Sequence, residues 1–179
     1  MNSKEIDQKI IELMRSHRDI YVIDDQILRE AKPDLIIAQG VCEVCAPFAK
    51  EINRAASILN CNPDILILDP PDLDDILSSI MDIAERVGRV TEGRNLVVSL
   101  QKRIDNVRKV GQRIGRGEVH NSNKPKVLCI EWIDPFFTAG HWVPQMVEIA
   151  GGINGLSSRA QPSRRMHDIN EIMKFNPDK

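Results

Sequence analysis

Short apolar runs alternate with segments of helical periodicity along the first part of the chain. In 4–16 the apolar residues recur every three or four positions, which predicts an amphipathic helix, and 26–31 predicts a second, shorter helix. The runs Leu35–Ala38 and Ile65–Leu68 are continuous and too short for surface helices, so we expect buried strands there. A helix over 45–59 separates the two strands. Strands and helices that alternate in this way predict an α/β fold.

Two longer helical patterns follow in the middle of the chain. Residues 73–87 place apolar side chains along one side, and 93–114 carry a similar stripe, so we expect a pair of helices. The next segment, 115–124, is rich in Gly, Asn and Ser and has no periodicity, which indicates a boundary between two lobes. Short helices are expected over 143–150 and 168–175.

Aromatic side chains are concentrated in one segment, Lys126–Gly152, although they make up only 4% of the chain. The segment begins with the apolar run Val127–Ile130, which predicts a buried strand, and it ends with a helix that starts near Pro144. We expect the residues between them to form a loop at the carboxyl end of the strand, where open α/β sheets bind ligands. This predicted loop contains Glu131, Trp132, Asp134, Phe136, Phe137, His141 and Trp142.

The composition argues against several classes of protein. The formal net charge of −2 argues against a nucleic-acid partner, because phosphate binding normally shows as an excess of basic residues. No apolar run approaches the roughly 20 residues of a membrane helix, so no membrane insertion is expected. The charged N-terminus lacks the apolar core of a signal peptide. As written, the chain is expected in the cytoplasm. If the natural protein begins earlier than this sequence, an extracytoplasmic location is expected instead.

Two of the cysteines, Cys42 and Cys45, are separated by two residues at the start of a predicted helix. Thiols in that position favour redox or metal chemistry, and buried thiols without such chemistry are the alternative. A zinc site needs two further ligands, and Cys61 and Cys129 have no second CxxC spacing, so we assign no metal site. No nucleophile–base pair, Gly-rich phosphate loop or HExxH pattern occurs. We therefore expect no catalytic residues and no enzyme activity.

Three segments carry a resemblance to a known family. Lys32–Gln39 reads KPDLIIAQ, a Lys-Pro-Asp-Leu entry into a strand, and Leu73–Ile114 holds the pair of long helices. Lys126–Asn154 reads KVLCIEWIDPFFTAGHWVPQMVEIAGGIN and ends with Ala-Gly-Gly-x-Asn at a helix end. With these features the chain resembles the class III periplasmic binding proteins of ABC importers, two-lobed proteins that bind cobalamin, iron–siderophores, heme or transition metals. It is most similar to their cobalamin-binding branch.

The resemblance implies an α/β, two-lobed class III periplasmic-binding-protein fold with long interlobe helices. It covers nearly the whole chain but only the middle part of a family member, so we expect a fold that is incomplete at both ends. The expected domains are a partial N-terminal α/β lobe (1–70), interlobe helices (71–114), a linker (115–125) and a partial C-terminal α/β lobe (126–179).

The resemblance also implies where a ligand contacts the two lobes. In the first lobe the positions are Gln39, Gly40 and Cys42, and in the second lobe they lie in the aromatic loop and in a basic pair after it. Those second-lobe residues are Trp132, Asp134, Phe136, Phe137, His141, Trp142, Arg164 and Arg165. Because indoles stack on flat macrocycles and guanidinium groups pair with carboxylates or phosphates, this chemistry fits a large, flat ligand.

In the family, the importer grips one acidic residue on each lobe. The matching positions here are Gln26 and Asn170, so we assign transporter docking to their acidic neighbours Asp24, Asp25 and Glu171.

These observations lead us to expect the substrate-binding component of an ABC-type importer, which captures cobalamin or a related corrinoid or iron chelate between two lobes. The ligand is cargo, and no cofactor is expected. The expected partners are this small molecule and ABC permease subunits, and the chain is expected to be a monomer. Two alternatives stay open: a cytoplasmic corrinoid- or metal-handling protein without a transporter, and a thiol redox enzyme that uses Cys42 and Cys45 with His141.

Overall fold

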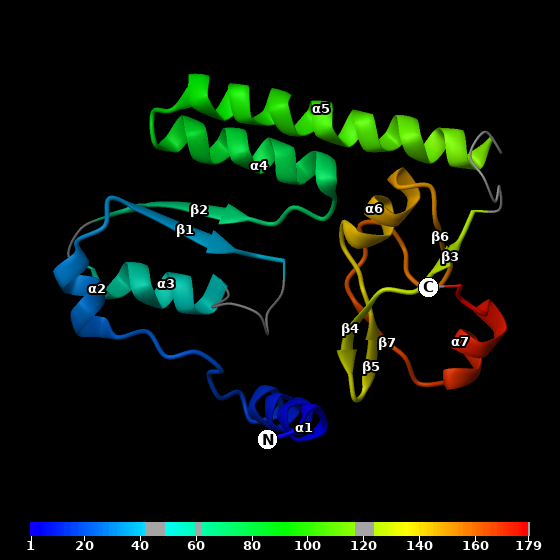
Figure 1. Cartoon of the computed structure of the whole chain (residues 1–179). Helices are drawn as coiled ribbons and strands as arrows, with labels where there is room; N and C mark the ends of the chain where they lie inside the picture. Colours follow the sequence, from blue (N-terminus) through cyan, green and yellow to red (C-terminus); the bar gives the residue numbers. More distant parts are fainter. Residues whose placement is uncertain (42–48, 60–61, 117–123, 179) are drawn as a thin grey trace. The chain divides into compact units, whose positions relative to one another are not determined.

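The computed structural model describes residues 1–41, 49–59, 62–116 and 124–178 (Figure 1). The chain divides into two compact units, Met1–Asp69 and Pro70–Lys179, which we call unit 1 and unit 2.

Unit 1 is built on two parallel strands. β1 (Leu35–Gln39) pairs with β2 (Asp64–Leu68) in continuous register from its first residue to its last. The helix α3 (Ala49–Ile58) lies between them in the sequence and against one face of the sheet in Figure 1. Its buried residues Ile52 and Ala55 and the strand residue Leu66 belong to the small core of this unit. Both predicted strands are therefore confirmed.

Two further helices precede the sheet. α1 (Ser3–Arg15) starts with a capping box in which Asn2 and Glu5 satisfy each other's backbone N–H groups. α2 (Asp25–Ala31) is capped by Asp24 at its start, and its C-cap residue Lys32 directly precedes a proline that cannot continue the helix.

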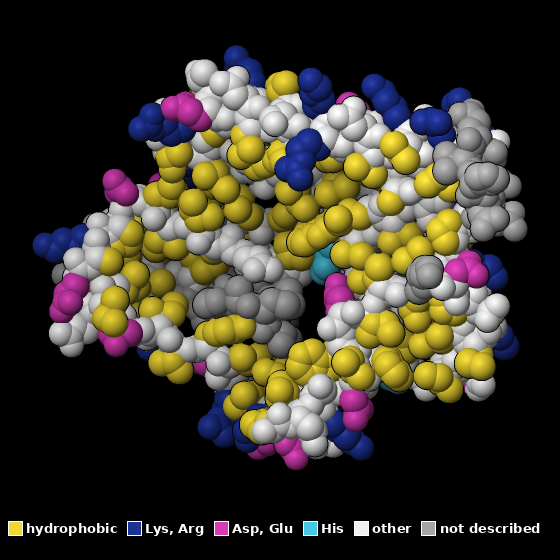
Figure 2. Space-filling model, viewed as in Figure 1, with side chains coloured by type: hydrophobic (Ala, Val, Ile, Leu, Met, Phe, Trp, Pro, Cys, Tyr) yellow, Lys and Arg dark blue, Asp and Glu magenta, His cyan; other side chains and the backbone are white. Residues whose placement is uncertain are grey.

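Unit 2 begins with the two long helices α4 (Leu73–Arg86) and α5 (Val90–Gly115), which run side by side in Figure 1. Asp72 caps α4, and the apolar side of α4 buries Leu77 and Ala84, as the periodicity predicts. Figure 2 shows Lys and Arg side chains spaced along α5. Both helices are confirmed, and α5 begins before the predicted start. Within the described residues, no helix has the length and apolar character that crossing a membrane requires.

The strand predicted at Val127–Ile130 is wrong as a single element. Of this run, only Val127 belongs to β3 (Lys126–Val127), which lies parallel to β6 (Ile153–Asn154). Pairing stops after Val127, and Ile130 begins a strand of a different sheet. One apolar run therefore serves two sheets.

The segment predicted as an aromatic loop is a β-hairpin. β4 (Ile130–Ile133) and β5 (Phe136–Thr138) are antiparallel, and β7 (Arg164–Arg165) adds a third strand beside β5. Ile, Trp, Phe and Thr favour strands, and the turn falls at Asp134-Pro135, where a proline does not interrupt the ladder. Trp132, Phe136 and Phe137 therefore lie on a sheet.

Two short helices complete unit 2, α6 (Val143–Ile149) and α7 (Ile169–Phe175), both close to their predicted ranges. Thr138 of β5 and Pro144 of α6 are fully buried. Of the predicted linker 115–125, Gly115 is the last residue of α5, and residues 117–123 lie outside the described part of the chain. The role of α4 and α5 as interlobe helices stays a prediction.

Candidate ligand-binding site

One face of the three-stranded sheet in unit 2 carries three of the side chains predicted to contact a ligand. Trp132 of β4 is paired with Phe137 of β5, which is paired with Arg165 of β7. Paired residues of antiparallel strands project from the same face, so the three side chains form a row across the sheet, which we call the Trp–Phe–Arg row. All three residues are partly exposed. The guanidinium carbon of Arg165 lies 5.8 Å from the centre of the Phe137 ring, within cation–π distance.

A β-bulge lies next to Trp132 in β4. The register of the β4–β5 pair shifts between Ile130, which is paired with Thr138, and Trp132, which is paired with Phe137. Without the shift, residues two apart on one strand would share a face. Bulges redirect side chains in this way and occur frequently next to functional sites. The indole N–H of Trp132 donates to the carbonyl of Asp134 at 3.0 Å, so the polar atom of the ring is satisfied within the hairpin.

The neighbours Phe136 and Arg164 belong to the opposite face. Successive residues of a strand point to opposite sides, so Phe136 and Phe137 cannot contact the same flat ligand from one face of the sheet. Arg164 is paired in register with the buried Thr138. Its guanidinium donates to the carboxylate of Glu171 at 2.6 Å, so a residue predicted to bind ligand and one predicted to dock the transporter are ion-paired with each other.

His141 and Trp142 lie in the turn between β5 and α6. Their rings are 5.7 Å apart with an interplanar angle of 39°, and both residues are partly exposed. The backbone of His141 is held from both sides: its N–H donates to the carbonyl of Gln161 at 2.6 Å, and its carbonyl accepts from Ala160 at 3.0 Å. Trp142 is the residue directly before α6. The segment 155–163, which we call the 155–163 loop, therefore fixes this turn.

Gly140 directly precedes this turn, and the backbone of the 155–163 loop packs against it too closely for a side chain. A Cβ at this position would lie 2.5 Å from the carbonyl carbon of Pro162 and 2.6 Å from the carbonyl oxygen of Gln161, so no larger residue fits without moving the loop. Glu131 closes the same junction, because its carboxylate accepts from the hydroxyl of Ser163 and, at 3.4 Å, from the N–H of Gly140. Glu131 was predicted only as part of the aromatic loop, without a role.

The first-lobe residues lie at the carboxyl end of β1 in unit 1. Gln39 is the last strand residue, and the N–H of Gly40 donates to the carbonyl of Leu68 at 2.7 Å, which extends the ladder by one bond. Cys42 and Cys45 lie outside the described residues. Joint binding of one ligand by these residues and the Trp–Phe–Arg row stays a prediction.

The two first-lobe docking acids have structural partners. The carboxylate of Asp24 accepts from the N–H groups of Gln26 and Ile27, both at 3.0 Å. The carboxylate of Asp25 is 3.4 Å from the guanidinium of Arg54 on α3.

Comparisons with solved structures place this arrangement in a known fold. An ABC transporter substrate-binding protein from Listeria monocytogenes EGD-e is 20% identical, with a TM-score of 0.63 over 87% of this chain and 55% of that one. The periplasmic heme-binding protein RhuT from Roseiflexus sp. RS-1 is 23% identical, with a TM-score of 0.64 over 88% and 56%. The periplasmic vitamin B12 binding protein BtuF of Vibrio cholerae is 18% identical, with a TM-score of 0.62 over 87% and 56%.

The chain has the class III periplasmic-binding-protein fold. This confirms the predicted fold class, and the chain spans somewhat more than half of the length of the solved proteins that it matches. No protein-family model matches the sequence, and the search of curated proteins gives no significant match. The assignment of the fold therefore rests on the comparison of structures.

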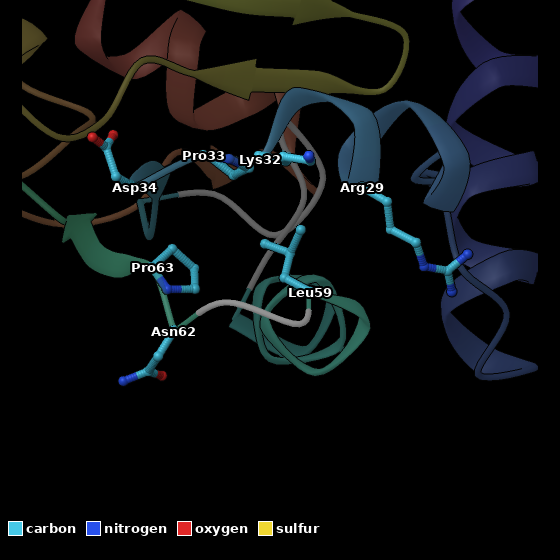
Figure 3. Close-up of a pocket in the computed structure, with 7 residues that line it drawn as sticks. All are labelled: Arg29, Lys32, Pro33, Asp34, Leu59, Asn62 and Pro63. Carbon is cyan, nitrogen blue, oxygen red and sulfur yellow. The ribbon is translucent and has the colours of Figure 1, made fainter.

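A pocket of about 400 Å³ in unit 1 does not coincide with any predicted site of this periplasmic-binding-protein fold (Figure 3). It lies at the amino ends of β1 and β2, whereas open α/β sheets bind ligands at the carboxyl ends. In Figure 3 the polar ends of Asp34 and Asn62 point away from Leu59, so the polar groups do not converge as they do in ligand sites. The pocket is lined by Arg29, Lys32, Pro33, Asp34, Leu59, Asn62 and Pro63.

Metal coordination by side chains has no support in the described part of the chain. No group of three or more His, Cys, Asp or Glu residues there is arranged to hold a metal ion. The chemistry that the described residues of unit 2 offer is stacking and anion pairing at the Trp–Phe–Arg row.

Proposed function

We propose that this chain is the ligand-binding component of an ABC-type importer and that its ligand is a flat metal chelate, either a corrinoid such as cobalamin or an iron chelate such as heme. The fold supports the first part, because proteins that share it include an ABC transporter substrate-binding protein, a heme-binding protein and a vitamin B12 binding protein. The observation that carries the second part is the Trp–Phe–Arg row of unit 2.

The row suits a flat anionic ligand for a physical reason. Trp132 and Phe137 offer aromatic surface to a macrocycle, and aromatic pairs contribute about 0.5–1.5 kcal/mol beyond the area that they bury. Arg165 lies at the end of the row, where its guanidinium can pair with a ligand carboxylate or phosphate. Heme carries carboxylates and cobalamin carries a phosphate. Capture by such a surface needs no covalent chemistry.

Transporter docking would require two ion pairs of this chain to open. Asp25 is paired with Arg54, and Glu171 is paired with Arg164. Exposed pairs of this kind contribute about 0–1 kcal/mol, so arginines of a permease can replace the internal partners at little cost. This is how Asp25 and Glu171 would serve the docking role.

Binding measurements with a panel of chelates test the proposal. The purified chain would be titrated with hemin, cyanocobalamin and an iron–hydroxamate siderophore in equilibrium dialysis, with absorbance as the readout. We expect hemin or cyanocobalamin to bind, and Phe137→Ala to weaken that binding about tenfold or more, since tenfold corresponds to about 1.4 kcal/mol. Arg165→Gln is expected to weaken it as well.

Arg94→Gln is the matched control, because Arg94 is an exposed residue of α5 that lies outside the row. Its affinity should equal that of the unchanged protein. Absence of binding to every chelate would contradict the proposed ligand class, and equal binding by Phe137→Ala would contradict the site. Genes for a permease and an ATPase beside this gene would favour an importer over a binding protein without a transporter.

A further inference from the structure

Arg159 joins the 155–163 loop to the start of α4. Its Nη2 atom donates to Oδ2 of Asp72 and to Oδ2 of Asp74, each at 3.0 Å. Asp72 uses its other carboxylate oxygen to cap α4, where Oδ1 accepts from the N–H groups of Asp74 and Asp75. One carboxylate therefore serves both the helix start and the loop.

In the ion pair between Arg159 and Asp72, the carboxylate is less exposed to water than the guanidinium. The Asp72 side chain is only 16% exposed, against 47% for Arg159. The backbone N–H of Asp75 and then the guanidinium of Arg159 lower the pKa of Asp72, against the opposing effect of burial. The hydrogen bond to Asp72 in turn raises the pKa of Arg159. Both groups therefore carry their charges throughout the neutral range.

The two residues after Arg159 are hydrogen-bonded to the backbone of His141. Ala160 donates its N–H to the carbonyl of His141, and Gln161 accepts from the N–H of His141. Ala160 and His141 both have positive φ angles, 58° and 54°, which residues with a Cβ adopt only when the surrounding structure holds them. The 155–163 loop and the turn thus depend on each other, and Arg159 is the point at which the loop is tied to α4.

Gln145 ties α6 to the same helix start. It is only 4% exposed, and its side-chain oxygen accepts from the N–H of Leu73 at 2.9 Å while its amide lies 3.4 Å from Asp74. Since α6 begins directly after Trp142, the first turn of α4 anchors both sides of the His141–Trp142 turn.

We propose that Arg159 is a positioning residue: by its ion pairs with Asp72 and Asp74 it holds the 155–163 loop, and through that loop it sets the position of His141 and Trp142 for ligand binding. The binding part of this inference rests on the proposed function and on the predicted ligand contacts of His141 and Trp142. The holding of the loop does not, and it is tested separately.

Amide hydrogen exchange tests the first step without a ligand. We expect Arg159→Ala to speed exchange at the amides of Ala160 and His141 about tenfold or more, while exchange in α5 stays unchanged. Arg159→Lys should restore part of the protection, because it keeps the charge. Arg94→Ala, which removes an exposed charge from α5, should change neither amide. Unchanged exchange in Arg159→Ala would overturn the proposal.

Affinity for hemin and cyanocobalamin tests the second step. We expect Arg159→Ala to weaken binding about fivefold to tenfold in the unchanged protein, and to weaken it no further in a protein that already carries His141→Ala and Trp142→Ala. A further loss of affinity in that second background would show that Arg159 does not act through these two residues and would overturn the positioning role. Asp74→Asn is a milder variant that leaves the Asp72 cap in place, and it should show the same pattern if Arg159→Ala fails to fold. Lack of any ligand would end the proposed function, while the exchange result would still decide whether Arg159 holds the loop.

Discussion

Gly111 of α5 is a position in unit 2 where a single added methyl group is expected to lower stability. It is buried where α5 meets the end of α6. A Cβ at this position would lie 2.8 Å from the N atom of Gly151, 2.9 Å from the carbonyl carbon of Ala150, and closer still to the carbonyl oxygen of Ile149. All three are backbone atoms, so no side-chain rotation relieves the overlap.

Two effects of opposite sign determine the stability of Gly111→Ala. Helix propensity favours alanine over glycine by about 0.8–1.0 kcal/mol. Overpacking of a well-packed site costs about 1–3 kcal/mol, and we expect the upper part of that range because only backbone can move. The net result is a loss of about 1–2 kcal/mol in the free energy of unfolding. For a unit of this size that corresponds to a fall in Tm of about 4–12 °C.

Urea unfolding followed by circular dichroism measures the difference. Gly115→Ala is the matched control in the same helix, because a Cβ there would meet only the flexible end of the Lys124 side chain. This control should be neutral or slightly stabilising. Equal stability of Gly111→Ala and the unchanged protein, or an equal loss in Gly115→Ala, would refute the argument that the α5–α6 junction is closed by backbone contact.

Two further outcomes are expected. Asp24→Ala should destabilise unit 1 by about 1 kcal/mol, measured by urea unfolding, because α2 loses the cap on its first N–H groups; an unchanged midpoint would contradict the role of the cap. The lowered pKa of Asp72 means that its contribution to stability is complete above its ordinary pKa of 3.8 and is lost as pH falls through the lower folded value. The Tm difference between the unchanged protein and Asp72→Asn should therefore be constant from neutral pH to about pH 5 and shrink below about pH 3.8. A difference that already shrinks near pH 6 would contradict the lowered pKa of Asp72.

The helices and the parallel strands could be predicted because their signals are local. Leu35–Ala38 and Ile65–Leu68 are apolar throughout, as buried parallel strands require, and the structure places β1 and β2 there with one residue more in each. The capping aspartates Asp24 and Asp72 lie directly before the helices that they cap. Each of these patterns is complete within a few residues of the sequence.

The hairpin could not be predicted because its partners are distant or ambiguous. The residues Ile130–Thr138 contain an aspartate and a proline, which also favour a loop, and the third strand, β7, comes 26 residues after the end of β5. Only the strand pairing decides that Trp132 and Phe137 share a face.

The ion pairs of Arg159 with Asp72 and Asp74 have no local signal in the sequence either. Arg159 and Asp72 are 87 residues apart, and neither lies in a pattern that indicates the other. A basic residue in a Ser- and Gly-rich stretch is usually solvated, and only the fold gives Arg159 its two carboxylates. The sequence therefore shows the aromatic segment, for which a ligand-binding role stays a prediction, but not the contacts that hold it in place.

The most direct test of the central claim uses the two indole N–H signals of the protein, since the chain has only two tryptophans. Nitrogen–proton correlation spectra of the labelled protein would be recorded during titration with hemin and with cyanocobalamin, and Trp132→Phe would assign the Trp132 signal. Binding at the Trp–Phe–Arg row predicts that this signal broadens or shifts in step with ligand uptake. Saturable binding that leaves the Trp132 signal unchanged would contradict the account.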